Sequence, residues 1–138
     1  MQLWTKQAGY PVCSVSRSQN SNKEVVLKFN QRRFFLNGSL PNEEEDYLWK
    51  IPIKIVTQSS YPTIHREFLL EKRVDEINIG HVNESDWIKI NKNSIGIYRT
   101  QYSQEMLFAL IEPVKRKVLH ATDRLGLQDD VFNLVITN

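Results

Sequence analysis

The sequence predicts a mainly β protein: an antiparallel β-sandwich of about seven or eight strands followed by two C-terminal α-helices. Two patterns lead to this prediction. Short segments within residues 1–102 alternate apolar and polar side chains, and this period of two is typical of a strand with one buried face. Residues 103–138 repeat apolar side chains every three or four positions, the spacing of an amphipathic helix. We therefore expect a β-sandwich domain over residues 1–102 and a helical segment over residues 103–138.

Strand candidates follow one another through the first three quarters of the chain. The alternation is clearest in residues 25–30, 49–55, 87–91 and 95–100. Weaker candidates are residues 11–16, 32–36, 63–70 and 74–79. Turn signals separate them at residues 37–39, 78–80 and 91–94, where Asn and Gly tolerate a positive φ. Many short strands with turns between them and no helical pattern predict an antiparallel sandwich or barrel.

Three residues of these segments carry further predictions. Pro52 lies on the polar side of residues 49–55 and cannot donate to a neighbouring strand, which indicates an edge strand or a bulge. Trp49 is in phase with the apolar face of its strand, so we expect it in the core. Trp87 is out of phase with the apolar positions that follow it, so we expect it on a flank of the sandwich or at an interface.

The C-terminal segment predicts two helices. Ser103 suits the N-cap of the first, and Pro113 should end or kink it. The second begins near Thr122 and Asp123, which can cap it and complement the helix dipole. The apolar positions are Met106, Leu107, Leu110, Ile111 and Val114 in the first helix and Leu127, Val131, Leu134 and Val135 in the second, where Phe132 and Ile136 widen the apolar face. A helix this apolar needs a partner surface.

Charge and cysteine content narrow the classes of function. The net charge is only +2 and the basic residues are scattered, so we expect no nucleic-acid partner. No apolar run approaches the roughly 18 residues that span a membrane, and residues 1–6 lack the features of a signal peptide. Cys13 is the only cysteine; it lies in an apolar stretch, and we expect it to be a small buried hydrophobe. A lone thiol fits a reducing compartment, so we expect a cytoplasmic protein without membrane contact.

The histidines do not form a zinc-binding pattern. His65, His81 and His120 are too far apart in sequence for two of them to share a helical turn, and the His-Glu-x-x-His arrangement is absent. We expect them to be surface or hydrogen-bonded residues. The acidic segment 41–46 lacks the alternating oxygen ligands and turn glycine of a calcium loop, so we expect a solvated loop there.

Motifs for other kinds of catalysis are absent too. The sequence contains no Gly-x-Ser-x-Gly elbow and no Gly-rich loop before a helix. The carboxylates of Glu67, Glu71, Asp75 and Glu76 could pair in space, although solvated faces and salt bridges are the usual outcome. We therefore assign no catalytic, cofactor-binding or metal-binding residue in this chain.

Five segments, in order along the chain, carry a resemblance. They are residues 4–12, 31–34, 49–53, the pair 87–91 and 96–102, and 123–132. The first reads Trp-Thr-Lys-Gln-Ala-Gly-Tyr-Pro-Val, and the last begins Asp-Arg-Leu-Gly-Leu-Gln. Together they resemble the zinc aminopeptidases, the family of aminopeptidase N and puromycin-sensitive aminopeptidase. The wording of the last two segments is nearest the cytosolic, puromycin-sensitive branch.

The resemblance implies a place in a larger enzyme. It puts a β-sandwich after the catalytic domain, and then the start of the C-terminal helical domain. The family's zinc ligands, general-base glutamate and transition-state tyrosine lie upstream, so zinc would belong to the parent enzyme and this chain should be inactive alone. Tyr98 matches a sandwich strand and is not that tyrosine. The implied partners are the catalytic and helical domains of the parent and its peptide substrates, whose N-terminal residues a zinc-activated water would remove.

Two other functions stay open. The chain could be a stand-alone β-sandwich that binds a peptide or protein, with its terminal helices as the docking surface. It could also be an independent hydrolase whose site is assembled from dispersed residues. The open-ended apolar second helix favours the aminopeptidase segment over the binding module, and the absent ligand and nucleophile motifs weigh against the hydrolase.

Overall fold

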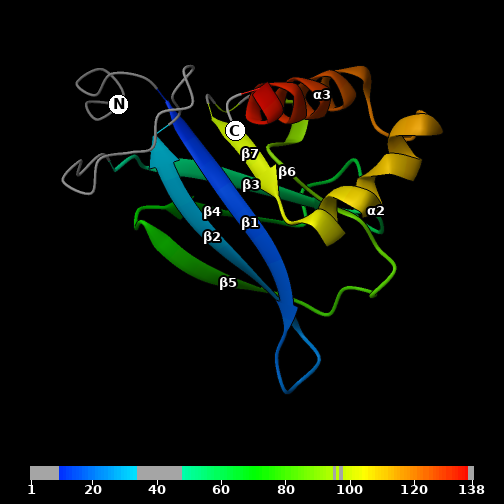
Figure 1. The fold of residues 1–138 in the computed structure, drawn as a ribbon. Coiled ribbons are helices and arrows are strands. Elements are labelled where there is room, and N and C mark those ends of the chain that lie inside the picture. Colours follow the sequence, from blue (N-terminus) through cyan, green and yellow to red (C-terminus); the bar gives the residue numbers. More distant parts are fainter. Residues whose placement is uncertain (1–9, 34–47, 95, 97, 137–138) are drawn as a thin grey trace.

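The computed structural model describes residues 10–33, 48–94, 96 and 98–136, and it is a β-sandwich followed by two helices. The strands are β1 (Pro11–Gln19), β2 (Val25–Arg33), β3 (Ile51–Thr57), β4 (Arg66–Leu70), β5 (Val74–Gly80), β6 (Ile88–Ile90) and β7 (Arg99–Tyr102). One sheet has the strand order β5-β2-β1-β7 and the other the order β4-β3-β6. The two sheets lie one behind the other in Figure 1, with the helices at one end. The predicted fold class is confirmed.

One strand pair departs from the antiparallel prediction. β7 pairs parallel to β1, from Val12 opposite Arg99 to Val15 opposite Tyr102, whereas the other four pairs among the described strands are antiparallel. The chain reaches β7 from β6, which belongs to the other sheet, so β7 is not joined to its neighbour by a hairpin. This crossover brings the end of the sandwich, and the helix that follows, beside β1.

Pro52 does not mark an edge strand, because β3 lies in the centre of its sheet. β4 pairs with β3 along residues 51–55, but β6 pairs only with residues 55–57. At Pro52 the strand therefore has a neighbour on one side only. The missing N–H is tolerated because the central strand is locally exposed at this position.

The predicted strand at 32–36 is wrong at its start, because Arg32 and Arg33 are the last residues of β2. Gln31 interrupts the apolar pattern but is itself completely buried. Its amide accepts the Trp49 N–H at 2.9 Å and donates to the Trp49 and Lys72 carbonyls, each at 2.9 Å. A fully bonded amide continues the inward face of β2 where the sequence suggests a break.

Residues 34–47, 95 and 97 lie outside the part of the chain that the structure describes. The predicted turn at 37–39 and the predicted acidic loop at 41–46 fall among them.

Alternating side chains from both sheets form the core. The inward residues include Leu27 and Phe29 of β2 and Ile51, Ile53 and Ile55 of β3, all with no exposed surface. Burial of this kind contributes on the order of 25 cal/mol per Å² of apolar area removed from water. Trp49 is fully buried in the same cluster, as predicted.

Two smaller predictions about buried residues and turns are also confirmed. Cys13 is free and completely buried, and burial raises the pKa of its thiol to about 12. Asn91, Asn93 and Gly80 have φ values of 59°, 62° and 81°, which are the left-handed conformations expected of the turn signals. Asn93 belongs to a 3-10 turn, Lys92–Ser94, that contacts α3.

The helices are α2 (Gln104–Lys115) and α3 (Ala121–Ile136). Ser103 is the N-cap of α2, as predicted, although its side chain makes no capping bond. Pro113 does not end α2: the helix continues for two residues, and Arg116 N–H still donates to the Glu112 carbonyl at 2.9 Å. No helix in the part of the chain that the structure describes is long and apolar enough to cross a membrane.

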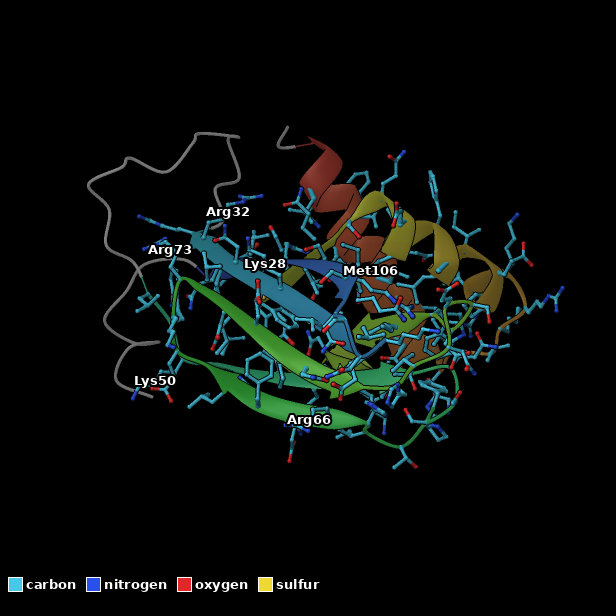
Figure 2. All side chains as sticks on the ribbon, turned by 90° about the horizontal axis from the view of Figure 1, so that it is seen from below. Lys28, Arg32, Lys50, Arg66, Arg73 and Met106 are labelled. Carbon is cyan, nitrogen blue, oxygen red and sulfur yellow. The ribbon has the colours of Figure 1, made fainter. Side chains whose placement is uncertain are left out.

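The helices share the hydrophobic core of the sandwich. Met106 and Leu110 of α2, and Leu127 of α3, belong to the same cluster of buried residues as the strand side chains. Met106 of α2 is labelled in Figure 2, together with the basic side chains Lys28, Arg32, Lys50, Arg66 and Arg73. Those basic groups are spread over strands and turns of both sheets. The absence of a nucleic-acid partner stays a prediction.

Candidate interface between the sandwich and the helices

The structure brings two of the three histidines together, but not as a metal site. His65 and His81 line one cavity of about 250 Å³ with Asp86. His65 Nε2 is 2.8 Å from the Ile79 carbonyl oxygen, and His120 packs its ring against Tyr61 at 5.1 Å between centroids. All three histidines are exposed, as expected of surface residues. Among the described residues there is no group of three His, Cys, Asp or Glu side chains that could hold a metal ion.

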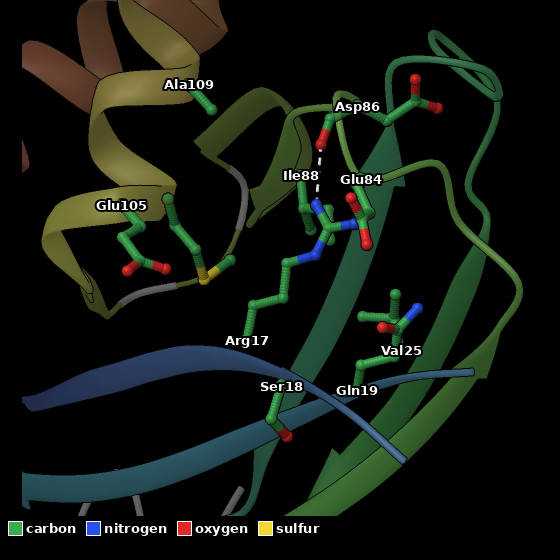
Figure 3. Close-up of a pocket in the computed structure, with 10 residues that line it drawn as sticks. Arg17, Ser18, Gln19, Val25, Glu84, Asp86, Ile88, Glu105 and Ala109 are labelled. Carbon is green, nitrogen blue, oxygen red and sulfur yellow. Dashed lines mark hydrogen bonds between the residues drawn. The ribbon is translucent and has the colours of Figure 1, made fainter. Parts of the chain in front are cut away.

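Arg17 lines a second polar cavity, where its contacts hold two segments of the chain together (Figure 3). This cavity of about 280 Å³ lies between β1, the loop before β6 and α2. Arg17 Nη1 donates to the Asp86 carbonyl and Nη2 to the Asn83 carbonyl, each at 2.8 Å. Glu84 and Glu105 also line it. The guanidinium therefore fixes the 83–86 loop against β1, and the arrangement offers no nucleophile with an adjacent base.

The main concentration of buried polar groups lies where α3 meets the sandwich, and its centre is Asp123. This residue has no exposed surface, although it lies in the first turn of α3. Its Oδ2 accepts the Tyr61 hydroxyl at 2.8 Å, and its Oδ1 accepts the Asn93 N–H. Lys89 Nζ lies 3.4 Å from Oδ1. Three donors from the sandwich thus satisfy one carboxylate from the helix.

The sequence-based role of Asp123 needs correction, because its carboxylate does not cap α3. The helix begins at Ala121, and the Asp123 side chain turns to the sandwich instead of its own first backbone N–H groups. A negative charge in the first turn still complements the helix dipole, as predicted. The additional contacts turn this helix start into a fixed attachment point.

Tyr61 extends the attachment to the residue before α3. Its hydroxyl donates to Asp123 and accepts the His120 N–H at 2.7 Å. Burial, with a further contribution from the Asp123 carboxylate, raises the pKa of Tyr61 to about 12, so the hydroxyl stays protonated and remains a donor. The Tyr61 ring also packs edge-on against Trp87, with centroids 5.4 Å apart. Trp87 is thus buried at this interface, one of the two positions expected for it.

Lys89 is the unusual member of the interface, since only 2% of its surface is exposed. Besides Asp123, its ammonium donates to the Ile90 carbonyl at 3.0 Å and the Asn91 carbonyl at 3.3 Å. Burial lowers the pKa of Lys89, and the Asp123 carboxylate opposes this shift. Such a buried pair is costly to break, because removal of one partner leaves a buried charge uncompensated.

A second set of contacts joins the middle of α3 to β7. Arg99 Nη1 lies 2.8 Å from Asp129 Oδ2 and 3.5 Å from Asp130 Oδ1, and its Nε donates to the Tyr10 hydroxyl at 3.2 Å. Asp130 Oδ2 accepts the Thr100 N–H at 3.2 Å. Two polar attachments about two helical turns apart therefore hold α3 against the sandwich.

The outer sides of α2 and α3 form an apolar groove of about 550 Å³. It is lined by Leu107, Phe108, Leu110, Ile111, Val114, Lys115, Leu127, Gln128, Val131 and Phe132. Phe108 and Phe132 are 58% and 64% exposed, which is unusual for aromatic side chains that lie together. We call this surface the α2–α3 groove.

Comparison with known proteins gives relatives along almost the whole chain. A family model described as ERAP1-like C-terminal domain matches residues 87–138, which include β6, β7 and both helices. Puromycin-sensitive aminopeptidase of Caenorhabditis elegans is 34% identical over 99% of this chain and 14% of its own length. Aminopeptidase M1-A of Oryza sativa subsp. japonica is 32% identical over 97% of this chain and 15% of its own. Endoplasmic reticulum aminopeptidase 2 of Bos taurus is 34% identical over 98% of this chain and 14% of its own.

The chain thus spans about one seventh of the length of the relatives that it matches. The matched part of the chain includes the sandwich, the interface residues around Asp123 and both helices.

Proposed function

Because the chain belongs to the family of aminopeptidase N and puromycin-sensitive aminopeptidase, we propose that it is the non-catalytic β-sandwich segment that joins the catalytic domain of such an enzyme to its C-terminal helical domain. One observation carries this proposal. Nearly all of this chain, 99% of it, matches the Caenorhabditis elegans aminopeptidase, but the match covers only 14% of that enzyme. The parent would be a zinc-dependent enzyme that removes N-terminal residues from peptides.

The chain's part in that enzyme is mechanical. The described residues offer no three-ligand metal set, so they do not fit a catalytic zinc and no step of hydrolysis is assigned to them. Their contribution is to fix the direction in which the helices leave the sandwich. The buried contacts of Asp123 and the contacts of Arg99 support this role, because both tie α3 to strands or turns of the sandwich.

The α2–α3 groove supports the second half of the role. Its lining is almost entirely apolar, and its most exposed aromatic groups, Phe108 and Phe132, lie on the helices that the family model includes. Further helices of the C-terminal domain would cover this groove and continue the packing that begins with α2 and α3. Helix pairs of this kind bury apolar stripes against their neighbours.

A cytoplasmic location is part of the proposal. The resemblance of residues 98–102 and 123–128 to the puromycin-sensitive branch supports it, and so does the free thiol of Cys13. Fractionation of the source cells tests it: recovery of the protein with endoplasmic reticulum markers would place it instead with its relative from that compartment.

A stand-alone binding module is the second candidate, and the α2–α3 groove is the observation that favours it. An exposed apolar groove between two helices can take an amphipathic helix from another protein. In that case the groove would be the functional site itself, and no catalytic partner domain would exist.

Two experiments test the proposed role. The purified 138-residue chain should neither hydrolyse aminoacyl substrates nor retain zinc after dialysis. Activity that co-purifies with the chain and is lost on chelation would overturn the non-catalytic assignment.

In the second experiment, this chain should be able to replace the aligned segment of the Caenorhabditis elegans relative. The chimaera should retain aminopeptidase activity, whereas the same chimaera with Asp123→Asn should lose a large part of it. A wild-type chimaera that folds but is inactive would contradict the joining role.

A further inference from the structure

The two aspartates that attach α3 to the sandwich are satisfied to different degrees. Asp123 receives a hydroxyl and a backbone N–H and lies beside the Lys89 ammonium. Asp130 accepts the Thr100 N–H at 3.2 Å and a long hydrogen bond from Arg99 Nη1 at 3.5 Å, and that guanidinium lies closer to Asp129, at 2.8 Å. Yet the Asp130 side chain is only 15% exposed. Asp130 is therefore a poorly compensated carboxylate in a mostly buried position.

Charged and titratable groups face Asp130 from every neighbouring element. Arg99 of β7 and Lys89 of β6 favour its charged form, and Asp129 on its own helix disfavours it. The hydroxyls of Tyr98 and Tyr102 also interact with it, and both stay neutral because burial raises the pKa of each tyrosine. Burial is the largest influence on Asp130 itself and raises its pKa to about 6, against the opposing effects of the Thr100 N–H and Arg99.

We propose that Asp130 makes the attachment of α3 to β7 proton-sensitive, with the helix held more tightly when this carboxyl takes up a proton. The geometry allows this because a neutral carboxyl still has an oxygen that can accept the Thr100 N–H. Protonation gives up the 3.5 Å ion pair with Arg99, but the cost of burying a charge disappears and the backbone contact remains.

The direction follows from proton linkage. The folded chain holds the Asp130 proton more strongly than the unfolded chain, in which the carboxyl has its ordinary pKa of 3.8. Unfolding therefore releases a proton between these two values, and stability falls as the pH rises through the window from about 4 to about 6. This inference rests on the anchoring role proposed above and adds a means of regulating it: mild acid strengthens the anchoring and neutral pH loosens it.

The test compares the chain with two variants at pH 7.5 and pH 5.0. The unfolding equilibrium constant of the unmodified chain should fall about tenfold more than that of Asp130→Asn on going to the lower pH. Asp129→Asn, an equal charge change on the exposed neighbouring residue, should keep the tenfold response. An equal response in all three proteins would overturn the proposal.

A second measurement follows the protonation of the Asp130 carboxyl in the unmodified chain, so the proposal can be tested even if the Asp130→Asn variant does not fold. A carbon-13 NMR titration of the unmodified chain should place the midpoint of the Asp130 carboxyl near pH 6, with a matching change at the Thr100 amide. A midpoint near 4 would overturn the proposal. If the titration fails while Asp123→Asn still detaches the helices, the anchoring role stands and only its proton sensitivity is lost.

Discussion

The sandwich core and the interface between the sandwich and the helices are stabilised by different interactions. The core between the sheets is formed by side chains such as Phe29 and Ile53, whose burial needs no specific partner. At the interface, the buried side chains of Lys89 and Asp123 and the half-buried Tyr61 depend on one another for hydrogen bonds and charge balance. The core thus tolerates changes that keep volume and apolarity, whereas the interface fixes one orientation of α3 through directional contacts.

The largest expected effect is on the core. Ile53→Asp introduces an unpaired carboxylate at a position with no exposed surface, so the chain should lose at least about 4 kcal/mol of stability or fail to fold. Thermal unfolding followed by circular dichroism measures this effect. The control is Lys54→Asp, the next residue on the outer face of β3, which should melt within a few degrees of the unmodified chain. A normal melting curve for Ile53→Asp would contradict the assignment of the inward face.

The next largest effect is on the buried pair. Asp123→Asn leaves Lys89 charged and buried without its counter-ion, which should cost about 3–5 kcal/mol. Urea unfolding gives the magnitude. Replacement of both residues, Lys89→Met with Asp123→Leu, should recover part of the loss because no charge is left unpaired. A double variant as unstable as the sum of the two single ones would mean that the pair itself is unimportant.

The effect of Tyr61→Phe should be smaller. It removes one donor to Asp123 and the acceptor of the His120 N–H, while the ring that packs against Trp87 remains. The expected loss is about 1–2 kcal/mol, and amide exchange should increase most in the first turn of α3. Unchanged exchange at residues 120–124 would show that the hydroxyl does not hold the helix start.

The smallest effect on stability is expected in the α2–α3 groove. Phe132→Ser alters an exposed side chain and should change stability by no more than about 0.5 kcal/mol. It should, however, reduce self-association of the isolated chain, which sedimentation velocity measures. Leu125→Ser is the matched control, since Leu125 is 65% exposed but does not line the groove. Equal association of both variants would mean that the groove is not the adhesive surface.

The same contrast explains what the sequence could predict. The apolar residues of β2 and β3 reveal the core because their period is visible without any knowledge of partners. Gln31 does not fit that period, and its buried amide becomes understandable only from the carbonyls of Trp49 and Lys72, one of them about 40 residues away in sequence. The parallel pairing of β7 with β1 is likewise a consequence of tertiary topology.

The interface residues gave little sequence signal of their role. Lys89 occupies what the alternation treats as an outward position, and Asp123 suggests only a helix start. Tyr61 lies in a loop. Their partners are separated by about 30 to 60 residues, so no local pattern connects them. The family resemblance indicated that helices follow a sandwich, but not which side chains join the two.

The most direct test of the proposed role is the size and activity of the native protein that carries this sequence. An antibody raised against the chain should detect a band far larger than 16.2 kDa in cell extract, and the precipitated protein should release N-terminal residues from peptides. A sole band at 16.2 kDa without aminopeptidase activity would contradict the account and assign the α2–α3 groove to an independent binding module.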